Sequence, residues 1–166
     1  MPITYRIGNA VLSAVKQAEV QRENHANNKV LIIHNCNNAG IWTQGFSRSI
    51  SARWYLPKDV YNRTITYQLG TTQFVSVEPN IVVANMISQN GVNSFGYHKQ
   101  RIDYDALRNC LKQVYTYAVT NDVTSIHLSR IGTRSGCGNW LTIESILIDE
   151  LGDMDTFVYD LYGKIE

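Results

Sequence analysis

The chain has 166 residues, of which 44% are hydrophobic and 17% are charged, and its formal net charge is +1. This composition predicts one ordinary globular domain over residues 1–166 and excludes a disordered chain. The near-neutral charge argues against nucleic acid as the main partner, and no stretch has the roughly 18 uninterrupted apolar residues of a membrane span.

In the first part of the chain, predicted strands and helices alternate. Residues 4–7 form a short strand that stops at Gly8-Asn9, and apolar periodicity predicts a helix from residue 10 to about residue 22. A polar connection, residues 23–28, leads into an apolar run at 30–33 that has the length of a buried strand. The next helix begins near Gln44 and must end before Pro57, and residues 58–65 form a further short helix.

The second part begins with two strand candidates, 72–77 and 81–86, whose three-residue link makes them antiparallel neighbours. A loop at 90–99 precedes a helix that Asp103 caps and that carries an apolar stripe from residue 107 to residue 118. A short strand at 125–128, a helix from Trp140 to Leu151 that Gly152 ends, and a strand at 157–161 complete the chain. This order predicts an α/β fold, a three-layer α/β/α sandwich around a mixed sheet.

Two Gly-rich loops each lie between a predicted strand and a predicted helix. The first contains Gly40 and Gly45, and the second runs from Gly132 to Gly138. Such loops present free backbone N–H groups at a helix start, and two of them on adjacent strands would suit a diphosphate. Either loop alone is equally compatible with tight packing. Neither has the spacing of a Walker or a dinucleotide-binding motif.

Four segments of the chain resemble the macrodomain family of ADP-ribose-binding modules. They are residues 5–10, residues 33–46 with their polar strand end, residues 83–89 followed by 102–107, and residues 127–140. The resemblance covers nearly the whole chain. Within the family it is closest to the compact branch that processes ADP-ribose-1″-phosphate and terminal ADP-ribosyl groups. It implies the macrodomain fold, ADP-ribose or ADP-ribose-1″-phosphate as ligand, and an ADP-ribosylated protein as a further partner.

The resemblance also implies which residues contact each part of the ligand. Gly8, Asn9 and Ala10 would meet the adenine, which Tyr159 and Asp160 would flank. Asn35, Cys36 and Asn37 would reach the distal ribose. The phosphates would be wrapped by one loop comprising Gly40, Trp42, Thr43, Gln44, Gly45, Phe46 and Ser47, and by another comprising Gly132, Thr133, Arg134, Ser135, Gly136, Cys137 and Gly138.

Some positions depart from the pattern of the family. Asn9 stands where many members have an Asp, so its acceptor oxygen carries no charge. Arg134 stands where relatives commonly have Gly, and it is either a phosphate ligand or a solvated surface side chain. The Lys and Asp of one ADP-ribosyl-glutamate hydrolase branch have no counterpart. A covalent mechanism that depends on Lys is therefore not expected.

If the protein is an enzyme, it is a hydrolase that acts at or beside the anomeric carbon of the distal ribose. Because no pair of carboxylates and no Ser-His-Asp set occurs in the loops, catalysis would depend on a water oriented by Asn37. His34 is the candidate for moving a proton, with a strand-end histidine that bonds only protein groups as the alternative. His127 is expected to be structural.

Three functions remain open. They are a hydrolase acting on ADP-ribose-1″-phosphate or a terminal ADP-ribosyl adduct, a non-catalytic ADP-ribose-binding module, and a single-stranded nucleic-acid binder suggested by the ten tyrosines. No cofactor or metal is expected, since the four histidines form no ligand-like pair. Three scattered cysteines, the absence of a signal peptide at the N-terminus and the absence of a membrane span predict a cytoplasmic protein.

Overall fold

Six strands form one mixed sheet in the part of the chain that the computed structural model describes, residues 3–24 and 27–161. The strands are β1 (Ile3–Ile7), β2 (Lys29–Asn37), β3 (Thr72–Glu78), β4 (Ile81–Gln89), β5 (Val123–Ser129) and β6 (Thr156–Asp160). Their order across the sheet is β1-β6-β5-β2-β4-β3. Neighbours run parallel except β3 and β4, which pair antiparallel as their short link predicts.

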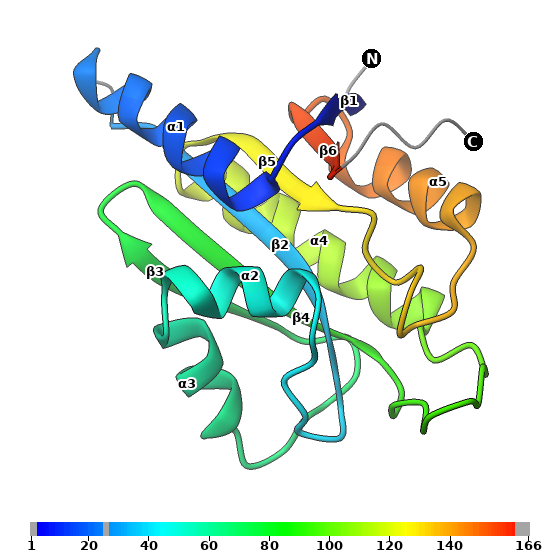
Figure 1. Ribbon diagram of the computed structural model, residues 1–166. Coiled ribbons are helices and arrows are strands. Elements are labelled where there is room, and N and C mark those ends of the chain that lie inside the picture. Colours follow the sequence, from blue (N-terminus) through cyan, green and yellow to red (C-terminus); the bar gives the residue numbers. More distant parts are fainter. Residues whose placement is uncertain (1–2, 25–26, 162–166) are drawn as a thin grey trace.

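Helices cover both faces of this sheet (Figure 1). The helices are α1 (Ala10–Glu23), α2 (Phe46–Arg53), α3 (Leu56–Asn62), α4 (Tyr104–Thr120) and α5 (Trp140–Leu151). The side chains of α4 and α5 pack with Leu31 and Ile33 of β2, whereas those of α1 and α2 pack with Val30 and Ile32. This alternation along one strand produces two apolar cores, and it confirms the predicted three-layer α/β sandwich.

The central strands β2 and β4 are buried on both faces because helices cover each side. Leu31, Ile32 and Ile33 are fully buried, and all nine residues of β4 are buried. Near-continuous apolar runs are typical of parallel strands in this position. None of the helices in the described ranges is long and apolar enough to cross a membrane.

Several element boundaries differ from the sequence-based expectation by a few residues. Strand β2 continues four residues beyond the apolar run, to Asn37, because its polar end still pairs with β4 up to Gln89. Helix α3 begins at Leu56, before Pro57, since the first turn of a helix needs no N–H partner and accepts proline there. The polar connection predicted at 23–28 includes residues 25–26, which lie outside the described part of the chain.

Candidate functional site

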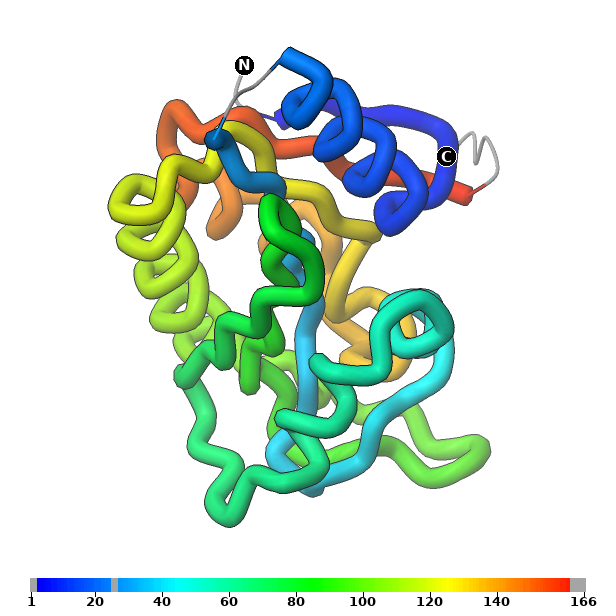
Figure 2. The backbone as a smooth tube through the Cα atoms, turned by 90° about the vertical axis from the view of Figure 1, so that its left-hand side faces the viewer, coloured from blue at the N-terminus to red at the C-terminus, as the bar shows by residue number. Residues whose placement is uncertain are grey.

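The carboxyl ends of five parallel strands meet at one edge of the sheet. The loops after β1, β2, β4 and β5 therefore emerge together, and the last residues of β6 lie beside them (Figures 1 and 2). In open α/β sheets, ligands bind off this edge. Both Gly-rich loops predicted from the sequence emerge here, and they follow β2 and β5, which are neighbours in the sheet.

Asn37 shapes the loop that follows β2. Its Oδ1 accepts hydrogen bonds from the N–H groups of Ala39 and Ile41 at 3.0 and 3.3 Å, and its Nδ2 donates to the Ile41 carbonyl at 2.7 Å. The Tyr61 hydroxyl donates to the Asn37 carbonyl at 2.7 Å and lies 2.9 Å from Oδ1. Asn37 is only 1% exposed. These contacts give the side chain of Asn37 a part in holding the loop.

An aromatic cluster of Trp42, Tyr61 and Tyr67 packs against the same loop. Trp42 lies 5.6 Å from the ring of Tyr61, and the rings of Tyr61 and Tyr67 are 4.9 Å apart. Gly40 has a positive φ of 76°, and a Cβ at this position would lie 3.0 Å from the Tyr67 ring. The loop thus needs a glycine here because the tyrosine occupies the space of a side chain.

His34 is 1% exposed, and both of its ring nitrogens have partners. Nδ1 is 2.9 Å from the Ser47 hydroxyl, and Nε2 is 2.5 Å from Oδ1 of Asn85. Burial lowers the pKa of His34 from 6.5 to about 4, which keeps the imidazole neutral at physiological pH. These contacts support the structural alternative for His34, because neither nitrogen is open to a substrate proton.

The side chains of Asn35 and Cys36 point to opposite faces of the sheet, although both residues are expected at the distal ribose. Successive residues of a strand point to opposite faces. Cys36 is buried against Tyr61 and Ile87, and this burial raises the pKa of its thiol well above the ordinary value. Asn35 is half-buried, and its Nδ2 donates to Oε1 of Gln89 at 3.0 Å. Of the two side chains, the structure leaves Asn35 open to a ligand.

The N-terminus of α2 has no side-chain cap. Asn9, Asp103 and Asn139 cap α1, α4 and α5 by accepting hydrogen bonds from first-turn N–H groups, whereas Gly45 precedes α2 and offers none. Within the described ranges, the backbone N–H groups of residues 42–48 donate no hydrogen bond to the protein. Gly45 has a φ of 84°, and a Cβ at this position would meet nothing within 4 Å. These N–H groups and the helix dipole favour an anion at this end.

The loop after β5 is closed upon itself. The Gly138 N–H donates to the Gly132 carbonyl at 2.7 Å, and a Cβ at Gly136 would approach that same oxygen to 2.6 Å. The glycines at 136 and 138 are therefore explained by the packing of the loop alone. In the described chain, the backbone N–H groups of residues 132–136 donate no hydrogen bond to the protein, so this loop also presents free donors.

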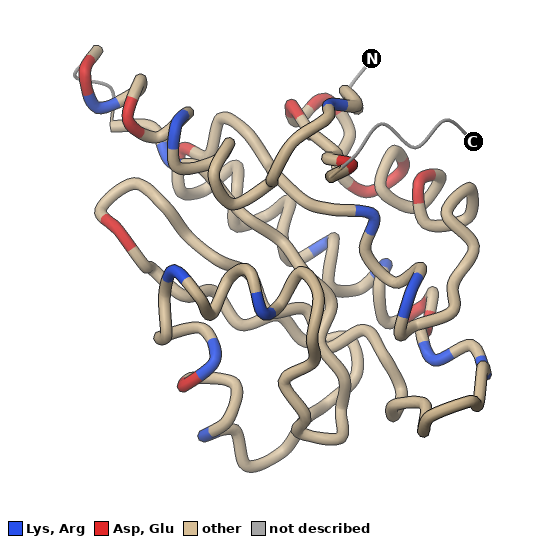
Figure 3. Tube along the Cα trace, in the orientation of Figure 1, with Lys and Arg blue, Asp and Glu red and all other residues tan. Residues whose placement is uncertain are grey.

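Basic side chains dominate the charge of these two segments. The loop at 130–139 carries Arg130 and Arg134, α2 carries Arg48 and Arg53, and neither segment contains a carboxylate (Figure 3). Arg134 is exposed, and among the described residues no carboxylate is paired with it. Arg130 forms an ion pair with Asp160 at 2.9 Å. Arg48 and Arg134 have no carboxylate partner among the described residues, and their charges suit a polyanionic ligand.

At the β1 end of the site, the side chains of the residues expected at the adenine form hydrogen bonds or ion pairs with other protein groups. Oδ1 of Asn9 caps α1 by accepting hydrogen bonds from Val11 and Leu12, at 2.9 and 3.1 Å. The Tyr159 hydroxyl is 2.8 Å from Nδ1 of the buried His127, and Asp160 is paired with Arg130. The carbonyl of Asp160 also accepts a hydrogen bond from the Gly8 N–H at 2.8 Å, which brings these two predicted segments into contact.

The remaining predicted residues belong to the same two loops, apart from Ala10 in α1 and Phe46 in α2. Thr43 is half-buried, Gln44 accepts a hydrogen bond from Arg48, and Ser135 is exposed. Thr133 donates to the Arg130 carbonyl, and Cys137 is half-exposed. Ala10 is buried at the start of α1, and Phe46 is half-buried between the two cores.

Sequence reasoning missed Tyr61, Gln89 and Asn93. Asn93 ties the loop after β4 to the loop after β5, since its Nδ2 lies 3.4 Å from the Ser135 carbonyl and 3.5 Å from Sγ of Cys137. No local pattern marks these three residues, because each acts on a segment distant in sequence. Among the described residues, no group of three or more His, Cys, Asp or Glu side chains could hold a metal ion.

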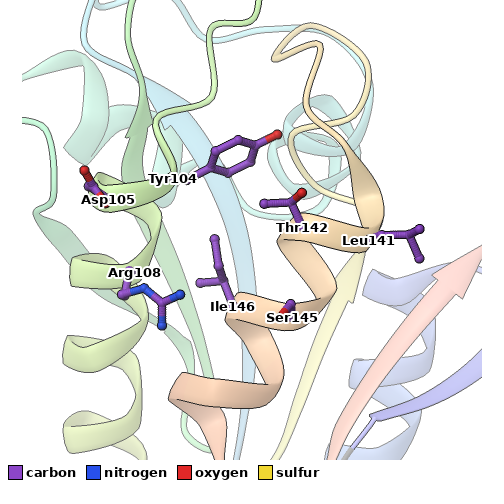
Figure 4. A pocket seen from close by; sticks show the side chains of 7 residues that line it. All are labelled: Tyr104, Asp105, Arg108, Leu141, Thr142, Ser145 and Ile146. Carbon is purple, nitrogen blue, oxygen red and sulfur yellow. The ribbon is translucent and has the colours of Figure 1, made fainter.

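Two surface cavities lie beside this edge rather than in it. One, of about 450 Å³, lies between α4 and α5, where Tyr104, Arg108 and Ile146 are among its lining residues (Figure 4). Arg108 is held there by Asp149 and Glu150. The other, of about 580 Å³, lies between the start of α1 and the helix α2, and Asn9 contributes to its wall.

Solved structures resemble the chain closely, although no protein-family model and no curated protein matches it. A protein of unknown function from Bacteroides thetaiotaomicron is 32% identical, with a TM-score of 0.80 over 97% of this chain and 99% of that one. A macrodomain protein from Streptomyces coelicolor is 31% identical, with a TM-score of 0.74 over 95% and 98% of the two chains. Thermosipho africanus DarTG, solved in complex with ADP-ribose, is 11% identical and shares the fold alone, with a TM-score of 0.62 over 82% and 39%.

Proposed function

The chain belongs to the macrodomain family, and we propose that it binds ADP-ribose at the carboxyl edge of its sheet. The observation that carries this proposal is the uncapped N-terminus of α2, which follows β2, beside a second loop with free N–H groups that follows the neighbouring strand β5. Together they offer the donors that a diphosphate needs. The DarTG complex supports the choice of ligand, since that protein has the same fold and holds ADP-ribose.

In this proposal, each part of ADP-ribose meets a different segment of the edge. The diphosphate lies between residues 42–47 and 132–136, with Arg134 as an additional cation. The adenine lies beside the Gly8–Asn9 turn, near Tyr159, and the distal ribose approaches Asn35. In the described chain, Oδ1 of Asn35 has no protein partner, so it can accept a hydrogen bond from a ribose hydroxyl.

Hydrolysis of ADP-ribose-1″-phosphate or of a terminal ADP-ribosyl adduct is the reaction that we propose for this site. The free N–H groups support it because, by fixing the diphosphate, they would hold the distal ribose and its leaving group beside the loop after β2. The water would be oriented by Asn35 and by the substrate itself, since Asn37 and His34 are occupied by protein groups. We propose a single ADP-ribose-binding domain over residues 1–166.

A non-catalytic ADP-ribose-binding module is the alternative, and one observation favours it. The two side chains expected to handle the water and the proton, Asn37 and His34, are each 1% exposed. Free backbone donors are sufficient for recognition alone. Release of product from ADP-ribose-1″-phosphate or from ADP-ribosylated protein separates the two functions.

The test of binding uses titration calorimetry with ADP-ribose on the unmodified protein and on two glycine variants. Gly45→Ala strains a backbone with a φ of 84° at the uncapped helix start, and Gly96→Ala strains an equally open position with a φ of 78° in the loop after β4. We expect Gly45→Ala to weaken ADP-ribose binding about tenfold and Gly96→Ala to leave it unchanged. Equal effects of both variants would contradict the proposed phosphate position.

The test of turnover follows phosphate and ADP-ribose release by chromatography, with the Asn35→Ala variant beside the unmodified protein. We expect Asn35→Ala to slow release. ADP-ribose binding without release from either substrate would identify a binding module and refute the hydrolase.

A further inference from the structure

Two side-chain amides meet where β2 and β4 end. Nδ2 of Asn35 donates a hydrogen bond to Oε1 of Gln89 at 3.0 Å, and Nε2 of Gln89 donates to the backbone carbonyl of Gly91 at 3.2 Å. Gln89 is only 2% exposed, whereas Asn35 is half-buried. The three groups therefore form a short chain of hydrogen bonds, which starts at a backbone carbonyl and ends on the side of the proposed ligand.

A shift in strand register brings Gln89 to Asn35. Cys36 of β2 pairs with Ile87 of β4, and the register shifts directly after this pair, so that β4 holds one extra residue. In a regular ladder, Gln89 would lie on the face of Cys36, opposite to Asn35, because alternate residues of a strand share a face. A bulge re-aims the side chain that follows it. The contact between the two amides therefore follows from the way in which two buried strands pair.

The carbonyl at the start of this chain is also held in place. The Gly91 N–H donates to Oδ1 of Asn38 at 2.7 Å, and the Asn38 N–H donates to the Gln89 carbonyl at 3.0 Å. Gln89 forms a further antiparallel bridge with Ile102. The loop after β2 thus fixes both the backbone of Gln89 and the carbonyl that its side chain reaches.

The Gly91 carbonyl sets the direction of both amides. A carbonyl only accepts hydrogen bonds, so the Gln89 side chain must turn its NH2 group to Gly91 and its oxygen to Asn35. Asn35 must then turn its own NH2 group to Gln89 and its Oδ1 away from it. This oxygen has no partner among the residues that the structure describes. A ligand therefore meets an acceptor whose direction is already decided by a backbone group.

Holding Asn35 in advance favours binding. A half-buried asparagine without a partner changes its side-chain conformation freely, and a ligand that orders such a side chain loses affinity in doing so. With Gln89 as its partner, Asn35 is ordered before the ligand arrives. The benefit is confined to the part of a ligand that contacts Asn35.

We propose that Gln89 is a positioning residue, which acts through Asn35 to give the site a preference for the distal ribose of ADP-ribose. This inference rests on the proposed function, since that function places the distal ribose at Asn35. Gln89 itself does not touch the ligand. Its hydrogen bond keeps Oδ1 of Asn35 directed toward a ribose hydroxyl. The site then prefers ADP-ribose to ADP, which has the same adenosine and diphosphate but no distal ribose.

The experiment measures the dissociation constants of ADP-ribose and of ADP by titration calorimetry and compares their ratio between variants. Gln89→Met keeps about the length of the side chain and removes the amide. We expect it to lower the preference for ADP-ribose about fivefold and to leave ADP affinity within about twofold. Gln113→Met is the matched control, because the Gln113 amide joins the Thr72 N–H to the Gly70 carbonyl at the edge strand β3. This control should leave the ratio unchanged.

Three further variants separate positioning from a purely structural role. In an Asn35→Ala background, Gln89→Met should leave the ratio unchanged, since the side chain through which Gln89 acts is gone. Gln89→Glu keeps an oxygen that accepts from Asn35 and, when protonated, an O–H that donates to the Gly91 carbonyl, so it should retain the preference within about twofold. Gln89→Ser is polar and too short to reach Asn35, and it should lose the preference as Gln89→Met does.

The outcomes distinguish this inference from the proposed function. If ADP-ribose fails to bind the unmodified protein, the proposed function is wrong. If ADP-ribose binds but Gln89→Met and Gln89→Ser leave the ratio unchanged, Gln89 has no positioning role. If Gln89→Met lowers the ratio equally in the Asn35→Ala background, Gln89 does not act through Asn35. In these last two cases, the inference is wrong and the proposed function stands.

Discussion

The Tyr61 hydroxyl lies 2.7 Å from the backbone carbonyl of Asn37 and 2.9 Å from its side-chain oxygen. Tyr61 is fully buried, and it comes from α3, which covers the end of β2. A single phenol thus sets the point at which β2 ends and its loop begins. The proposed phosphate donors at residues 42–48 follow directly from that point, so a residue outside the ligand-binding loops controls where they lie.

Replacing Tyr61 with Phe should weaken both the fold and the loop. Because a buried hydroxyl with two partners is lost, we expect the free energy of unfolding to fall by about 1–2 kcal/mol in urea denaturation. ADP-ribose affinity should fall further than AMP affinity, because the loop meets the diphosphate and the distal ribose. Tyr67→Phe removes a hydroxyl that bonds the Tyr61 carbonyl at 2.8 Å, and it is the matched control. Equal losses for ADP-ribose and AMP would contradict the role of Tyr61 in placing the loop.

Replacing Arg134 with Gln should weaken ADP-ribose binding about tenfold, since a guanidinium that reaches a diphosphate forms a charge-assisted hydrogen bond. The side chain is exposed, so the variant should keep its stability. The dependence of the dissociation constant on salt concentration should also become shallower. Lys112→Gln, on the exposed side of α4, serves as the control. Unchanged affinity would identify Arg134 as a solvated surface residue.

The stability of the protein should fall as the pH is lowered from about 6.5 to about 4. Burial lowers the pKa of His34 and of His127 to about 4, and nearby Arg6 adds to the effect at His127. The unfolded chain then binds up to two more protons than the folded protein in this window, so acid favours unfolding. Each histidine should contribute a slope of up to about 1.4 kcal/mol per pH unit.

Urea denaturation at several pH values within this window measures that slope. In the His127→Asn variant, the slope of the free energy of unfolding against pH should be smaller by the equivalent of close to one proton. This difference does not depend on how stable the variant is. A slope that is the same in both proteins would show that His127 titrates normally in the folded state.

Cys137 should react with a thiol reagent much faster than the other two cysteines. Cys36 and Cys110 are buried, and burial raises the pKa of Cys36 well above its usual value and that of Cys110 to about 11. Cys137 is half-exposed in the loop after β5. Mass spectrometry after brief alkylation should find the label at Cys137, and ADP-ribose should slow its incorporation. Labelling that ADP-ribose does not affect would place the ligand away from this loop.

The sequence alone was enough to predict the elements and their order. Periodicity identified the helices α1, α4 and α5, and Asp103 and Gly152 marked their ends as predicted. The three-residue link between β3 and β4 correctly implied an antiparallel pair. These features depend on residues within a few positions of one another, and local propensity and patterning are sufficient to encode them.

Only the tertiary structure decided what the polar residues at the end of β2 do. Asn85, the partner of His34, lies 51 residues further along the chain, and Tyr61, the partner of Asn37, lies 24 residues further. The sequence places these side chains at the end of a strand. At that position, a side chain that binds a ligand and one that forms a buried hydrogen bond within the protein are equally consistent with the sequence. Packing distinguishes the two, because a buried polar side chain must find its partner in whichever segment the fold brings beside it.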